Sequence, residues 1–131
     1  DLLYEKKLFD NLYLICGPDK SYIAKKIIDI SKKNYFVDCS QKDLIGVITA
    51  IKNSKFFVGN NSGPLNLAAA LGVPSFGLIA NDAISELKYS KIQFITPDNY
   101  KDNTWIRDRK NMKTLTTQKV FETLINKLDS D

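Results

Sequence analysis

The sequence has no histidine in its 131 residues and contains only two cysteines. Without an imidazole, a general base that works near neutral pH has to be a carboxylate, and no carboxylate stands out for that role. Cys16 and Cys39 lack the spacing of a zinc site or a disulfide framework, so we expect two reduced thiols that serve packing. We therefore predict neither a bound metal nor a cofactor, and no catalytic residue can be assigned.

Long apolar runs are also missing. No run approaches the roughly 18 to 20 residues that a membrane-spanning helix needs, and the acidic, tyrosine-containing N-terminus is not typical of a secretory signal. The content of 44% hydrophobic and 26% charged residues is typical of a globular domain. We therefore expect one domain over residues 1–131 in a cytoplasmic protein, with a peripheral place at the inner face of the membrane as an alternative.

The net charge of +4 comes largely from scattered lysines. Such lysines usually cover solvated helix faces, yet they also favour an anionic partner such as a nucleotide sugar, a lipid phosphate or a membrane surface. No segment combines a basic stripe with interleaved aromatic residues, so no nucleic-acid partner is expected. The lysines include Lys25, Lys26, Lys32, Lys33 and Lys52.

Short apolar runs alternate with segments of helical periodicity. Strands are expected at residues 12–16, 35–37, 55–58, 75–79 and 92–95. Residues 2 to about 10 are expected to form the end of a helix, and further helices are expected to span about 20–33, 64–71 and 117–128. Ser40 and Asp43 form a capping-box-like start for one further helix. This alternation predicts an α/β protein with a doubly wound, Rossmann-like parallel sheet that is covered by helices on both sides.

A small polar turn joins an apolar strand to an Ala-rich helix within residues 56–74. The first N–H groups of a helix have no carbonyl partner and carry partial positive charge, which favours a bound phosphate. Glycines let the backbone approach a ligand closely, and proline suits the first helical turn. The turn is also compatible with a capped helix that binds nothing. Its residues are Gly59, Asn60, Asn61, Ser62, Gly63 and Pro64.

This turn resembles the signature of the heptosyltransferases, glycosyltransferase family 9, which reads roughly Gly-x-Asp-Ser/Thr-Gly-Pro-x-His-x-Ala-Ala-Ala-Leu-Gly-x-Pro. Residues 12–19 resemble the family's strand that ends in Gly-Gly-Pro, and residues 111–120 resemble the start of its last helix. The three segments follow the family's order and cover most of the chain. The matching signature residues are Gly59, Ser62, Gly63, Pro64, Ala68, Ala69, Ala70, Leu71, Gly72 and Pro74.

The resemblance implies the C-terminal, donor-binding half of a GT-B-type inverting glycosyltransferase. Gly17 and Asp19 would contact the ribose or base, although Asp19 is equally typical of a helix cap. Asn61 and Asn66 stand where the family has an acid and a histidine, and an amide brings neither charge nor titration. The residues implied in diphosphate binding are Asn60, Asn61, Ser62, Gly63, Pro64 and Asn66.

The resemblance also implies that the chain lacks the first strand of this half and the N-terminal acceptor domain, which supplies the base. The expected partners are a nucleoside diphosphate sugar, a separate acceptor domain or chain, and an anionic lipid or glycan acceptor such as lipopolysaccharide. A non-catalytic remnant or binding module of the same fold is one alternative, and an unrelated doubly wound protein is another. A dinucleotide-dependent oxidoreductase is not expected, because no Gly-x-Gly-x-x-Gly follows a strand.

A polar loop at residues 97–111 precedes the last predicted helix. An exposed tryptophan beside arginines would suit contact with an acceptor, a partner domain or an anionic lipid surface. The other interpretation is a solvated loop whose tryptophan covers the edge of the sheet. The residues in question are Tyr100, Trp105, Arg107, Arg109 and Lys110.

Overall fold

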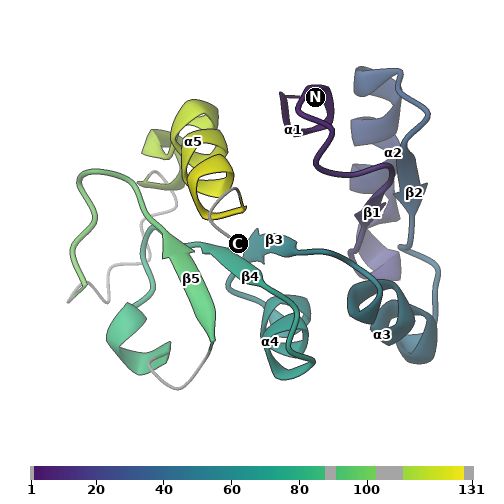
Figure 1. The fold of residues 1–131 in the computed structure, drawn as a ribbon. Coiled ribbons are helices and arrows are strands. Elements are labelled where there is room, and N and C mark those ends of the chain that lie inside the picture. The colour runs from purple at the N-terminus through teal and green to yellow at the C-terminus, as the bar shows by residue number, and fades with distance from the viewer. Residues whose placement is uncertain (1, 88–90, 103–110, 129–131) are drawn as a thin grey trace. The chain divides into compact units, whose positions relative to one another are not determined.

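A computed structural model describes residues 2–87, 91–102 and 111–128 (Figure 1). The strands are β1 (Leu12–Leu14), β2 (Phe36–Asp38), β3 (Phe57–Asn60), β4 (Ser75–Leu78) and β5 (Ile92–Ile95). The α-helices are α1 (Leu2–Glu5), α2 (Ser21–Ser31), α3 (Leu44–Lys52), α4 (Gly63–Ala70) and α5 (Thr117–Leu128). Three short 3-10 helices are η1 (Pro18–Lys20), η2 (Ile84–Leu87) and η3 (Asn111–Thr114).

The chain divides into two compact units, residues 1–54 and residues 55–131. Each unit has its own parallel sheet, with the strand order β1-β2 in the first and β3-β4-β5 in the second. The predicted alternation of helices and parallel strands is therefore confirmed, while the doubly wound arrangement stays a prediction. None of the helices within the described ranges has the length and apolar character needed to span a bilayer.

The first unit is built around aromatic side chains. Tyr35 immediately precedes β2 and is only 3% exposed. Its ring stacks on that of Tyr4 from α1 at a centroid distance of 4.3 Å, and Phe9 meets it edge-on at 5.5 Å. These contacts bring α1 onto the start of β2, because large rings bury much apolar surface in one place.

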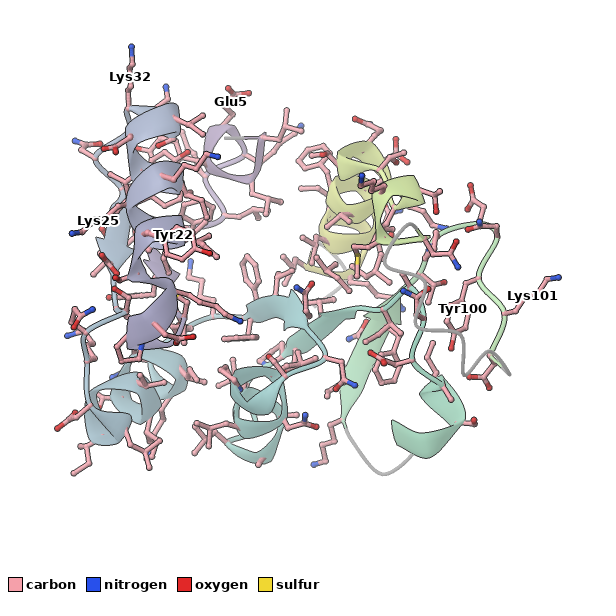
Figure 2. The ribbon with its side chains drawn as sticks, turned by 180° about the vertical axis from the view of Figure 1, so that it is seen from behind. Glu5, Tyr22, Lys25, Lys32, Tyr100 and Lys101 are labelled. Atoms are coloured by element: carbon pink, nitrogen blue, oxygen red, sulfur yellow. The ribbon has the colours of Figure 1, made fainter. Side chains whose placement is uncertain are left out.

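The sheet of the second unit carries the larger apolar core. Phe76 of β4 is 1% exposed, and Leu65 and Ala68 of α4 are fully buried. Gly77 lies under α4, where an added Cβ would stand 3.1 Å from Leu65 Cδ2. The missing side chain thus lets α4 lie close to β4. Helix α5 lies on the opposite side of this sheet from α4 (Figures 1 and 2) and buries Leu124.

The predicted start of α3 is wrong by three residues. The helix begins after Asp43, whose Oδ1 accepts a hydrogen bond of 2.8 Å from the Gly46 N–H. Ser40 is buried instead, and its N–H donates to Asp38 Oδ1. Asp43 is therefore the N-cap residue of α3, and the expected helix start at Ser40 is wrong.

Candidate functional site

Three loops of the second unit emerge at one edge of its sheet. The strands are parallel, and the register aligns Asn60 of β3 with Leu78 of β4 and Leu78 with Ile95 of β5. The carboxyl ends of parallel strands meet at one edge, and ligands of open α/β sheets bind there. The loops that follow these strands are therefore the first place to look for a site.

The turn between β3 and α4 leaves the start of the helix open. Ser62 is the N-cap residue with an extended backbone, φ −159° and ψ 166°, but its side chain makes no capping hydrogen bond. The Ser62 carbonyl accepts from the Asn66 N–H at 3.2 Å, which closes the first helical turn. Because no described side chain caps α4, the first N–H groups are available to another acceptor.

Gly63 adds open space to this helix start. An ideal Cβ built on Gly63 would have no described atom within 4 Å. Gly59, at the end of β3, is different, since a Cβ there would lie 2.8 Å from Phe57 Cε1. Gly63 is therefore not required by packing inside the protein, whereas Gly59 accommodates a neighbouring ring.

Asn61 of the turn and Asn66 of α4 already have partners in the protein. Asn66 Nδ2 donates to the Ser62 carbonyl at 2.9 Å, so this amide is turned toward its own helix. Asn61 Nδ2 donates to Asp82 Oδ2 at 3.3 Å, which links the loop after β3 to the loop after β4. Asn61 thus faces a carboxylate from the neighbouring strand's loop.

Tyr100 joins the loop after β4 to the segment that follows β5 (Figure 2). Its hydroxyl lies 2.7 Å from the carbonyl oxygen of Asp82 and 3.0 Å from Asp102 Oδ1, both of which can accept its proton. The Ile84 N–H donates to the same hydroxyl at 3.1 Å. Burial is the main reason why the pKa of Tyr100 is raised, so the phenol keeps its proton.

Asp102 completes this connection. Its Oδ1 accepts from the Ser85 N–H at 3.1 Å and, at 3.0 Å from the Tyr100 hydroxyl, shares the single phenol proton with the Asp82 carbonyl. The Ser85 hydrogen bond, followed by that of Tyr100, holds the pKa of Asp102 below its usual value of 3.8. The loop after β4 is therefore held at Asp82, Ile84 and Ser85 by two residues from beyond β5.

The other predicted site residues belong to the first unit. Gly17 and Asp19 follow β1, and an added Cβ on Gly17 would lie only 2.5 Å from Asp19 Oδ1. The Asp19 carboxylate thus folds back over Gly17. It caps neither η1 nor α2, whose N-cap positions make no side-chain hydrogen bond in the described part of the chain. The role of these two residues toward a ribose or base stays a prediction.

Sequence reasoning identified the turn after β3 but missed Asp82 and Asp102. Both lie in loops after parallel strands, and that position was the available signal for a role at the site. Tyr100 was singled out only as part of the polar loop. The remaining residues singled out there, Trp105, Arg107, Arg109 and Lys110, lie outside the described residues.

Comparison with known families adds an independent observation. The sequence profile of Glycosyltransferase family 9 (heptosyltransferase) matches residues 3–125, which is nearly the whole chain. The match includes both the turn after β1 and the turn after β3. No curated protein and no solved structure gives a significant match.

Proposed function

Because the chain belongs to glycosyltransferase family 9, the heptosyltransferase family, we propose that its second unit binds the nucleoside diphosphate of a sugar donor. The sugar would pass to a cell-surface glycan or lipopolysaccharide acceptor. The observation that carries the proposal is the start of α4, where the Ser62 side chain makes no capping hydrogen bond and the space beside Gly63 is open. A diphosphate fits such a helix start, because unpaired N–H groups and the helix dipole both favour an anion.

The chemistry of the turn suits the leaving group of the reaction. When a sugar is transferred, negative charge grows on the departing diphosphate, and fixed backbone donors stabilise it. Ser62 adds a hydroxyl that is free to donate, since it makes no bond to the helix. Asn60, Asn61 and Asn66 complete the proposed contacts, with Pro64 shaping the first turn.

We propose that a partner supplies the general base that activates the acceptor. With no histidine in the sequence, we assign the base to a separate acceptor domain or chain that meets this donor site. The location proposed for the whole system is the cytoplasm, at the inner face of the membrane where a lipid-linked acceptor is reached. Cys16 and Cys39 are free thiols, which is usual in a reducing compartment.

A non-catalytic binding module of the same fold is the second candidate. It is favoured by Asn66, whose amide nitrogen is already used by the Ser62 carbonyl. It is also favoured by Asn61, which brings no charge of its own to the turn. Such a module would bind the nucleotide without supporting transfer.

Calorimetric titration of the full chain with ADP, UDP and GDP tests the proposal. We expect saturable binding of one nucleotide and an affinity at least about tenfold lower in Gly63→Val, whose side chain fills the space beside the first turn. Asn61→Ala tests the amide of the turn in the same assay. Ala70→Val is the matched control, because Ala70 is an exposed residue at the other end of the same helix.

The outcomes of this test differ clearly. Nucleotide binding that is lost in Gly63→Val but kept in Ala70→Val supports a donor site at this turn. If the chain binds none of the three nucleotides at millimolar concentration, the proposed function is wrong. Equal loss of binding in both variants would point to a disturbed helix rather than a blocked site.

A further inference from the structure

We infer that Asp82, which is hydrogen-bonded to Asn61, is a specificity-determining residue whose carboxylate accepts a hydrogen bond from a hydroxyl group of the donor sugar. The inference rests on the proposed function, because it needs the diphosphate at the start of α4. Asp82 lies in a loop after a parallel strand, but its sequence neighbours do not point to a sugar. Its role follows from the hydrogen bond of 3.3 Å between Asn61 Nδ2 and Asp82 Oδ2, which connects residues 21 positions apart.

The position of Asp82 is fixed by its backbone. Its carbonyl oxygen accepts from the Tyr100 hydroxyl at 2.7 Å, and Ile84, two residues later, donates its N–H to the same hydroxyl at 3.1 Å. Ser85 is tied to Asp102 at 3.1 Å. A carboxylate on a loop with three such ties is oriented before a ligand arrives, which lowers the entropy cost of binding.

The side chain remains accessible while its backbone is held. Asp82 and Asn61 are both exposed. A carboxylate has two oxygens and about four lone-pair positions, so acceptor capacity remains after one bond from Asn61. The Asn61 side-chain carbonyl is a second acceptor on the same pair. Two adjacent acceptors match the donors of neighbouring hydroxyl groups on a sugar ring.

The negative charge of Asp82 favours a different part of the donor from the part that the start of α4 favours. A carboxylate repels a phosphate that approaches its oxygens, whereas the N–H groups at the start of α4 attract it. Asn61 lies between the two, two residues before Gly63 and hydrogen-bonded to Asp82. The diphosphate therefore belongs at the helix, and the uncharged, hydroxyl-bearing part of the donor belongs at Asp82.

A divalent cation is the competing ligand for a carboxylate near a diphosphate. Such ions take several oxygen ligands, and the described residues contain no group of three or more acidic, histidine or cysteine side chains that could hold one. A hydroxyl group needs only the acceptors that Asn61 and Asp82 already provide. The two ligands are distinguished by the dependence of binding on Mg²⁺.

The test compares a nucleotide with its own sugar derivative. The nucleotide that the full chain binds among ADP, UDP and GDP is titrated beside ADP-heptose, UDP-glucose or GDP-mannose, as appropriate, into the wild type, Asp82→Ala and Asp29→Ala. Asp29 is an exposed acid on α2 of the first unit and serves as the charge-matched control. Each titration is repeated with Mg²⁺ and with EDTA, and thermal unfolding checks that each variant is folded.

We expect Asp82→Ala to bind the nucleotide within about twofold of the wild type and the sugar nucleotide about tenfold more weakly. Asp29→Ala should match the wild type for both, and EDTA should change neither affinity. The inference is overturned if Asp82→Ala binds the sugar nucleotide like the wild type. It is also overturned if both ligands weaken equally or if EDTA abolishes binding. A wild type that binds no nucleotide overturns the proposed function, and this inference with it.

Discussion

The hydroxyl of Tyr100 lies 2.7 Å from the carbonyl oxygen of Asp82, so a hydrogen bond connects the segment after β5 to the loop after β4. The same hydroxyl accepts the Ile84 N–H at 3.1 Å. One phenol therefore acts as donor and acceptor for two backbone groups of a single loop. It fixes that loop at the sheet edge where Asp82 meets Asn61.

Replacing Tyr100 by phenylalanine should loosen the loop after β4. The variant leaves the Asp82 carbonyl and the Ile84 N–H without this partner, and we expect a loss of about 1–2 kcal/mol in the free energy of unfolding. Urea denaturation measures the loss. Tyr22→Phe on α2 is the control, because the Tyr22 side chain is 65% exposed. Equal denaturation midpoints for the two variants would contradict the role assigned to Tyr100.

The carboxyl of Asp102 should titrate at low pH. Its hydrogen bonds from the Ser85 N–H and then from Tyr100 place its pKa below 3.8 in the folded chain. A lowered pKa in the folded state means that the stabilisation is present above the pKa of the unfolded chain and is lost as the pH falls through the folded value. NMR titration of the Asp102 carboxyl carbon should therefore give a midpoint below 3.8.

The Tyr100→Phe variant offers a check on that cause. Removing one of the two main hydrogen bonds should move the Asp102 midpoint upward, but only part of the way, since the Ser85 bond is the larger contribution. A midpoint that is unchanged in this variant would show that Tyr100 does not act on Asp102. A return to the ordinary value would show that Ser85 contributes little.

Alanine should have different effects at two glycines of the second unit. At Gly77 the new Cβ would stand 3.1 Å from both Ile92 Cγ2 and Leu65 Cδ2, inside the packed core. We expect Gly77→Ala to cost about 1–3 kcal/mol, because overpacking forces the backbone or side chains to shift. Gly63→Ala should cost nothing measurable, because its Cβ would have no described neighbour within 4 Å. Similar denaturation curves for both variants would contradict this packing.

The elements with a clear apolar period could be predicted well from the sequence. The bounds of β5 and α5 agree with the expected residues 92–95 and 117–128, because apolar side chains recur there with the period of each structure. The contact between Asn61 and Asp82 could not be predicted, because it depends on which strands are neighbours and on their register. Local patterns describe a turn, but the partner of that turn comes from a distant segment.

The caps of α3 and α4 show the same limit. Both Asp43 and Ser62 are residues that favour N-cap positions, yet only the Asp43 side chain accepts a helix N–H, from Gly46 at 2.8 Å. The sequence predicts that both residues can cap a helix. It does not predict which of them is left without that bond, since this depends on the side-chain rotamer in the folded turn.

This difference gives the last prediction, which compares Asp43→Ala with Ser62→Ala. Asp43→Ala removes a hydrogen bond from the start of α3 and should cost about 1 kcal/mol in the free energy of unfolding. Ser62→Ala removes no capping bond, so its denaturation midpoint should equal that of the wild type. Under the proposed function, stabilisation by a bound nucleoside diphosphate should instead depend on Ser62, whose hydroxyl would donate to the ligand, and not on Asp43. The thermal shift produced by the nucleotide should therefore be smaller in Ser62→Ala and unchanged in Asp43→Ala; a shift of wild-type size in Ser62→Ala would exclude a ligand contact for its hydroxyl.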